Sequence, residues 1–234
     1  IRRPPRSTLD RSSAASDVYK RQKLELGNYE MEMIYHDPLI FTLKGVLTEE
    51  ECQHFINVSS DKMKRSTVSG YGEEAERKDH LDNRRTSSNC WIGHTQDSIT
   101  LAAVKRISEL VQIPSSHAEA FQVLHYSNSQ EYQPHLDTFD TDDEGYQPYL
   151  ENGGQRIVTA LAYLNDVEKG GETSFPNVGK VVTPETGKIV VFHLCKKGTV
   201  ETHPNALHGA MPVIEGEKWA FNLWFREQER IETI

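Results

Sequence analysis

The sequence predicts a mainly β fold with flanking helices, built around an antiparallel sandwich or barrel. From Glu119 onward, short runs of β-branched and aromatic residues are separated by turn sequences such as "NGGQ", "EKGGE" and "TPETGK". Strands punctuated in this way are typical of antiparallel sheets arranged in two layers or closed into a barrel. Before Glu119 the chain has two segments of helical periodicity, which we expect to pack on the sheet as support.

The first helix is predicted in "TEEECQHFINVSSDKM", after a strand-like stretch, "PLIFTLKGVL". Thr48 and Glu51 have the spacing of a capping box, in which each side chain binds the other residue's backbone N–H. Phe55, Ile56 and Met63 would form the apolar side of this helix.

The second helix is predicted in "HTQDSITLAAVKRISELVQIP", where Pro114 lies just past the end. Its apolar positions at helical spacing are Ile99, Ala103, Ile107 and Leu110. The polar, charged segment 64–83 between the two helices predicts a loop, and "NRRTSSNCWI" follows it.

The strands of the C-terminal half are predicted in "EAFQVLHYS", "RIVTALAYLND", "GKIVVFHL", "LHGAMPVI" and "EKWAFNLWFRE". Segment 138–154, between the first two, is acidic, carries Tyr146 and Tyr149, and is long for a hairpin connection. A loop of this length is either a lid over a neighbouring site or a mobile surface loop.

Composition excludes several classes of protein. The 234 residues suffice for one sizeable domain, and the net charge of −9 argues against a nucleic-acid partner bound through its phosphates. No run approaches the length of a membrane-spanning helix. Cys52, Cys90 and Cys195 lie far apart, so they predict neither a disulfide framework nor a thiolate zinc site.

The first 22 residues differ sharply from the rest. They carry six basic residues against Asp10 and Asp17 and are rich in serine. Such a segment can be misread as an organelle transit peptide. It also resembles translated adapter sequence, and we expect residues 1–22 to be a non-native or disordered leader, which leaves the cellular compartment undetermined.

A candidate metal site begins in "EYQPHLDTFD", where His135 and Asp137 stand two positions apart. On a strand, residues i and i+2 project from the same face, so these side chains can converge on a metal; equally, they can be two polar residues at a strand end. Non-haem Fe(II) oxygenases bind iron through two histidines and one carboxylate. The candidates for the third ligand are His193, His203 and His208.

Lys218 is the second unusual residue, because it stands in the apolar strand sequence "KWAFNLWF". A lysine turned toward a protein interior is costly without an anionic partner. Lys218 therefore either lies on the solvent face or binds a carboxylate carried by a cosubstrate. An open iron site beside an interior lysine is what a 2-oxoglutarate pocket requires.

Three stretches in order carry a family resemblance: "VLHYSNSQEYQPHLDTF", "NGGQRIVTALAYLNDVEKGGETSFP" and "PNALHGAMPVIEGEKWAFNLWFRE". Together they resemble the catalytic domain of the prolyl 4-hydroxylases, which are iron- and 2-oxoglutarate-dependent dioxygenases. The resemblance covers residues 119–227, and "RRTSSNCWI" extends it. It implies a double-stranded β-helix, or jelly roll, with a dioxygenase domain at 118–228 and a helical support region at 23–117.

The resemblance also implies roles for individual residues. The implied iron ligands are His135, Asp137 and His208. The residues implied to bind 2-oxoglutarate are Lys218, Tyr126 and Thr173. The residues that match positions holding a peptide are Arg85, Ser87, Glu119, Tyr132, Arg156 and Trp224. The sequence departs from the family pattern at Met211, where many members have cysteine, and at Arg226, where some have histidine.

The implied reaction is hydroxylation of peptidyl proline to 4-hydroxyproline, using Fe(II), 2-oxoglutarate and O2 and releasing succinate and CO2. Ascorbate would restore the iron after uncoupled cycles, and the expected substrate is a proline-rich peptide or protein. The resemblance implies the endoplasmic reticulum for a eukaryotic host and the cytoplasm for a bacterial or viral one.

Three alternatives remain open from the residues. The same ligands could hold zinc and activate water for hydrolysis, although a hydrolase needs no second carboxylate pocket. A jelly roll could serve as a binding module without catalysis. A 2-oxoglutarate oxygenase could also act on another residue, such as lysine, or on a small metabolite.

Overall fold

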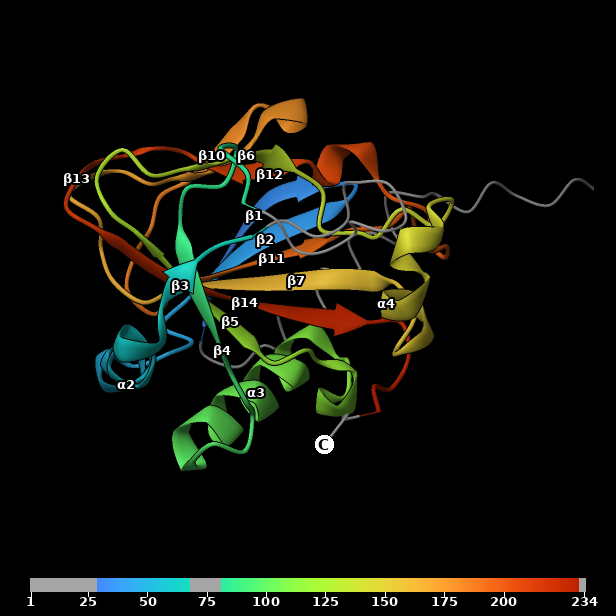
Figure 1. Ribbon diagram of the computed structural model, residues 1–234, viewed down its shortest axis with the longest axis horizontal. Coiled ribbons are helices and arrows are strands. Elements are labelled where there is room, and N and C mark those ends of the chain that lie inside the picture. Colours follow the sequence, from blue (N-terminus) through green and yellow to red (C-terminus); the bar gives the residue numbers. More distant parts are fainter. Residues whose placement is uncertain (1–28, 68–80, 232–234) are drawn as a thin grey trace, which may run out of the picture.

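The computed structural model of the protein describes residues 29–67 and 81–231 (Figure 1). The leader expected at residues 1–22 lies outside this part. None of the helices in the described ranges is long and apolar enough to span a membrane.

An eight-stranded antiparallel sheet forms the centre of the molecule (Figure 1). Its strands, in spatial order, are β1 (Glu30–His36), β2 (Leu39–Lys44), β11 (Ile189–His193), β7 (Arg156–Tyr163), β14 (Lys218–Arg226), β5 (Phe121–Tyr126), β4 (Ser88–Ile92) and β3 (Lys64–Arg65). β1 to β4 come from the N-terminal half, so that half supplies strands to the sheet as well as helices. The sequence analysis did not predict β1, the short β3 or β4 as strands.

A smaller sheet packs against one face of the large one. Its strands, in spatial order, are β10 (Lys180–Val182), β9 (Thr173–Phe175), β12 (His208–Ala210) and β6 (Tyr132–His135). One core cluster contains Phe175 and Val182 of the small sheet together with Leu161 and Phe192 of the large sheet. The two layers and their shared core confirm the predicted mainly β sandwich.

Two helices cover the opposite face of the large sheet, as predicted (Figure 1). They are α2 (Glu49–Ser59) and α3 (Ser98–Val111). The capping box of Thr48 and Glu51 is present at the start of α2. Phe55 of α2 lies 4.9 Å from Phe221 of β14, between ring centroids, and both side chains are fully buried.

The predicted strands form, with one difference. The stretch "LHGAMPVI" holds two strands, β12 and β13 (Val213–Glu215), because the chain changes partner at Met211 and Pro212. Proline has no N–H to donate to a ladder, and the carbonyl of Pro212 accepts from Gly171 outside the strands. β13 pairs with β8 (Lys169–Gly170) in a separate two-stranded sheet.

Segment 138–154 is not structureless. It contains the 3-10 turn η3 (Glu144–Tyr146) and the short helix α4 (Gln147–Glu151). The ring of Tyr149 stacks on Phe139 at 5.3 Å between centroids, so the segment carries a small aromatic cluster of its own. Whether it closes as a lid stays a prediction. The remaining 3-10 turns are η1 (Ser60–Lys62), η2 (Ser115–His117), η4 (Pro176–Val178) and η5 (Pro204–Ala206).

Candidate active site

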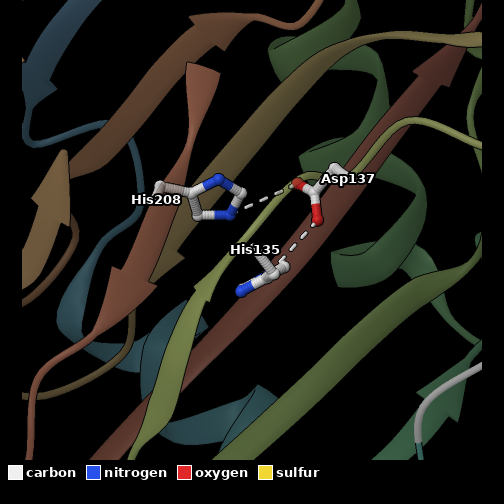
Figure 2. A group of neighbouring side chains, drawn as sticks. All are labelled: His135, Asp137 and His208. Carbon is white, nitrogen blue, oxygen red and sulfur yellow. Dashed lines mark ion pairs between the residues drawn. The ribbon is translucent and has the colours of Figure 1, made fainter. Parts of the chain in front are cut away.

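The pairing of two short strands brings a metal-binding group together (Figure 2). β12 pairs with β6 so that His208 lies directly opposite His135, and Asp137 follows two residues after His135. One ligand atom from each of the three side chains lies within 4.8 Å of the other two. The strand register thus selects His208 from the three candidate histidines. His193 ends β11, and His203 faces Asp37 at 3.5 Å between Nε2 and Oδ1.

Hydrogen bonds orient both histidines toward the same point. His135 Nδ1 lies 3.0 Å from the carbonyl of Gln133, and His208 Nδ1 lies 3.0 Å from the carbonyl of Ala206. A carbonyl only accepts, so Nδ1 carries the proton in each ring and Nε2 keeps its lone pair. The two Nε2 atoms face Asp137 at 3.6 and 3.5 Å. Two lone pairs and a carboxylate that converge in this way repel one another until a cation binds between them, and this donor set fits Fe(II).

Burial sets the charges of this group. Burial lowers the pKa of the His208 imidazole to about 4, so the ring is neutral at physiological pH. Burial by itself would raise the pKa of Asp137, but the positive charge of the doubly protonated imidazoles of His208 and His135 holds it well below its usual range. The hydroxyl of Thr159 on β7 donates to Asp137 Oδ2 at 2.8 Å. Thr159 therefore orients a ligand from behind, a role that the sequence analysis did not assign.

Lys218 lies inside the protein at the start of β14, as the interior alternative predicts. Its side chain is 1% exposed, and Nζ donates to the carbonyl of Gly171 at 2.7 Å. Within the described residues it has no ion pair, and burial lowers its pKa to about 7. A buried ammonium without an anion is unfavourable, so the position suits a ligand that brings a carboxylate.

The surroundings of Lys218 add a residue that the sequence analysis missed. Nζ lies 5.4 Å from the ring centroid of Tyr126 and 5.3 Å from that of Tyr163. Tyr163 donates its hydroxyl to Thr173 Oγ1 at 2.7 Å. Because Thr173 accepts this bond, its own proton is free to be donated to a carboxylate. The phase of Tyr163 on β7, four residues after Thr159, could have placed it on this inner face.

A cleft of about 460 Å³ opens beside the three-residue group, with His135 and Asp137 in its wall. Four of the residues expected to hold a peptide line it: Arg85, Tyr132, Arg156 and Trp224. The Tyr132 ring stacks on His135 at 3.6 Å between centroids, next to the metal-binding group.

The other two expected peptide residues lie behind the cleft wall. Ser87 is fully buried and donates to Ser66 Oγ at 3.0 Å. Glu119 accepts from Arg156 Nε at 2.7 Å and from Arg226 Nη1 at 2.9 Å. The Arg156 guanidinium in turn covers the ring of Trp224 at 3.7 Å. Glu119 thus holds the arginine that shapes the wall.

Comparisons with known proteins agree with this geometry. The model of the 2OG-Fe(II) oxygenase superfamily matches residues 121–226. A probable prolyl 4-hydroxylase of Arabidopsis thaliana, number 6, is 38% identical over 206 residues, which cover 80% of this chain and 68% of the relative.

Solved structures give the same result for the fold. A viral collagen prolyl hydroxylase from Paramecium bursaria Chlorella virus-1, in complex with 2OG, aligns with a TM-score of 0.61 and 25% identity over 80% of this chain and 95% of that one. A prolyl hydroxylase from Trichoplax adhaerens, bound to a peptide fragment of hypoxia inducible factor, aligns with a TM-score of 0.60 and 14% identity over 94% of each chain. These likenesses confirm the jelly-roll fold expected from the sequence.

Proposed function

The chain belongs to the prolyl 4-hydroxylase family of 2OG-Fe(II) oxygenases, and we propose that the site at His135, Asp137 and His208 performs the reaction of this family. The reaction is hydroxylation of proline at C4 with Fe(II), 2-oxoglutarate and O2, with ascorbate to keep the iron reduced. The observation that carries the proposal is the convergence of two imidazole lone pairs and a carboxylate beside a cleft.

Different residues of the site would bind the iron and the 2-oxoglutarate. His135, Asp137 and His208 would hold iron, and Lys218, with Thr173 and Tyr126, would hold the distal carboxylate of 2-oxoglutarate through charge-assisted hydrogen bonds. When bound, the metal and cosubstrate supply the oxidation, in which 2-oxoglutarate becomes succinate and CO2 and one oxygen atom enters the substrate. The protein orients the proline ring and excludes water from the reacting atoms.

The substrate we propose is a proline-rich peptide or protein segment. Such segments take the extended polyproline II form, which docks on aromatic surfaces. Tyr132 and Trp224 supply aromatic rings to the cleft, and Arg85 and Arg156 supply hydrogen-bond donors. The bound peptide of the Trichoplax structure supports a peptide rather than a free metabolite.

We also propose the domain limits expected from the sequence, with the dioxygenase unit at 118–228 and a support region before it. All the residues assigned to iron and to 2-oxoglutarate fall in the former. β4 of the support region pairs with β5 of the dioxygenase unit along its whole length, so the two segments share one sheet.

The experiment is an assay of the full chain with Fe(II), 2-oxoglutarate, ascorbate and a library of proline-containing peptides. We expect succinate release coupled to the gain of one oxygen atom on proline, detected by mass spectrometry. Asp137→Ala should lose both signals and stoichiometric Fe(II) binding. His125→Ala is the matched control, since His125 pairs with Glu217 away from the cleft and should keep all three.

Two outcomes would replace the proposal with an alternative. Oxygen gained only on residues other than proline would overturn the substrate. Peptide hydrolysis with zinc and without a keto acid would overturn the oxygenase assignment.

A further inference from the structure

Three buried polar atoms in the cleft wall have no hydrogen-bond partner among the described residues. Five buried side-chain atoms in the described ranges lack one, and three of them belong to cleft residues: Arg85 Nε, Trp224 Nε1 and Asn222 Oδ1. Arg85 and Trp224 are 7% and 4% exposed, and Asn222 is 8% exposed. A buried polar atom without a partner costs stability, so such atoms gathered in one cleft point to a ligand that satisfies them.

The orientation of the Asn222 amide follows from its neighbours. Arg85 Nη2 donates to Gln122 Oε1 at 3.1 Å, and a guanidinium can only donate, so the oxygen of Gln122 must face Arg85. Asn222 meets that same oxygen at 3.5 Å and must present its NH2 to it. The carbonyl oxygen of Asn222 is therefore the atom left without a partner, and the cleft contains a buried acceptor.

Asn222 stands in a row of cleft residues across three strands. It lies opposite Gln122 of β5, which lies opposite Trp91 of β4. All three line the cleft, and Trp91 is 50% exposed, with its ring 6.0 Å from that of Trp224. The row thus combines an exposed indole face with a buried acceptor.

The spacing matches an extended peptide. Asn222 and Trp224 are two positions apart on β14, so their Cα atoms are about 6–7 Å apart, close to two residues of polyproline II. A chain in this form has no internal hydrogen bonds, and each proline removes one N–H while keeping its carbonyl. Two free donors and one free acceptor suit a main chain in which carbonyls outnumber N–H groups.

We propose that Asn222 and Trp91 form a subsite that selects a residue with a backbone N–H beside the target proline. The inference rests on the proposed function and deepens it by naming a substrate class. Asn222 Oδ1 accepts a hydrogen bond from the backbone N–H of this neighbouring peptide residue. Trp91 packs on the side chain of the same peptide residue. A second proline at that position has no N–H, so it leaves the buried acceptor unsatisfied. The enzyme therefore prefers isolated prolines over proline runs.

The first test needs only the wild-type chain and an ester scan of a hydroxylated peptide. Each backbone N–H within two residues of the target proline is replaced by an ester oxygen, which removes the donor and keeps the shape. We expect one position at which kcat/KM falls about tenfold, the effect of one unpaired buried acceptor. Proline at that position should give a loss at least as large.

The second test assigns this effect to Asn222. Asn222→Leu keeps the branched shape of the side chain and removes the acceptor, so kcat/KM for the all-amide peptide should fall about tenfold. The sensitive ester should then cause no additional loss, because the two changes remove the same bond. Asn222→Ala replaces the leucine variant if the latter does not fold. His125→Ala is the control, because His125 pairs with Glu217 away from the cleft and should keep the preference.

The outcomes separate the two claims. Absence of hydroxylation in every proline peptide overturns the proposed function itself. Hydroxylation that no ester position alters, or ester losses that add to those of Asn222→Leu, overturns only the subsite.

Discussion

The two ends of strand β14 carry buried cations in opposite situations. Lys218 begins the strand and Arg226 ends it, and they are 1% and 3% exposed. Arg226 shares the Glu119 carboxylate with Arg156 and also donates to the carbonyls of Tyr149 and Gly154. Lys218 has no anionic partner among the described residues.

Structural charges and ligand-binding charges differ in whether the protein supplies their counter-ion. Burial alone would raise the pKa of Glu119, but Arg156 and Arg226 hold it below its usual range, so the carboxylate stays charged and the cluster is complete. At Lys218, burial lowers the pKa to about 7 in spite of the charge of Glu172, and no carboxylate of the described residues forms an ion pair with it. A buried cluster whose charges are balanced within the protein stabilises the fold. A buried charge without a counter-ion instead marks a position where a charged ligand binds.

Removing the unpaired charge of Lys218 should change 2-oxoglutarate affinity more than any other substitution proposed below. Lys218→Met should weaken 2-oxoglutarate binding by about 100-fold or more, because losing one partner of a buried ion pair costs about 3 kcal/mol or more. The free energy of unfolding without cosubstrate should stay equal or rise, since an unpaired buried ammonium disappears. Calorimetric titration and urea unfolding measure the two quantities.

Lys188→Met is the matched control for this lysine. Lys188 is also buried, at 8% exposure, but it pairs with Glu185 at 2.9 Å. The Lys188→Met substitution should leave 2-oxoglutarate binding unchanged. Equal loss of cosubstrate affinity in both variants would mean that Lys218 acts through the fold and not through a ligand.

Breaking the ion cluster of Glu119, Arg156 and Arg226 should lower the free energy of unfolding. Glu119→Gln leaves Arg156 and Arg226 buried without their shared anion, so the free energy of unfolding should fall by about 3 kcal/mol. Urea unfolding measures it. Glu51→Gln is the comparison, because the ion pair of Glu51 with Arg106 is partly exposed and should contribute less. A loss no larger than that of Glu51→Gln would show that the buried cluster does not hold the fold.

The sequence indicated the role of Lys218 but not the role of Arg226. "KWAFNLWF" made Lys218 conspicuous, because a lysine in an apolar strand needs a reason. Arg226 differs from the family pattern, and its sequence position did not disclose that Glu119, more than a hundred residues earlier, lies beside it. Pairing over such distances depends on strand register, which local periodicity does not contain.

The metal-binding group shows the same division. The two-residue spacing of His135 and Asp137 follows from strand geometry, whereas His208 was one of three candidates from the residues alone and was chosen by resemblance. The opposite placement of His208 and His135 on β12 and β6 is a tertiary fact. Thr159 and Tyr163 were missed because threonine and tyrosine are ordinary in strands, and only their hydrogen bonds distinguish them.

The affinity for 2-oxoglutarate should depend on pH through Lys218. With a pKa of about 7, Lys218 is mostly neutral at pH 8 in the free protein, and a bound carboxylate requires its charged form. Binding at pH 8 should therefore take up close to one proton, and affinity should fall by up to tenfold per pH unit as pH rises above about 7. Calorimetry in buffers of different ionisation enthalpy measures the uptake.

The sign for folding without cosubstrate is the reverse. The folded pKa lies below the ordinary value of 10.5, so between about pH 7 and 10.5 the unfolded chain holds a proton that the folded chain has released. Stability should rise with pH across this window through Lys218, and Lys218→Met should remove that contribution. Binding at pH 8 without proton uptake would show that Lys218 is already charged.

Removing the Tyr163 hydroxyl, which bonds Thr173 near Lys218, should have a small effect. Tyr163→Phe removes the donor to Thr173, so the Thr173 hydroxyl is no longer oriented with its proton toward the cosubstrate carboxylate. Because one neutral hydrogen bond contributes about 1 kcal/mol, 2-oxoglutarate affinity should fall by about fivefold, measured by titration. Tyr29→Phe is the control, since Tyr29 packs on the helix-covered side of the sheet. An unchanged affinity in Tyr163→Phe would show that Thr173 is oriented by the ligand itself, and the pocket around Lys218 would then owe its selectivity to the lysine alone.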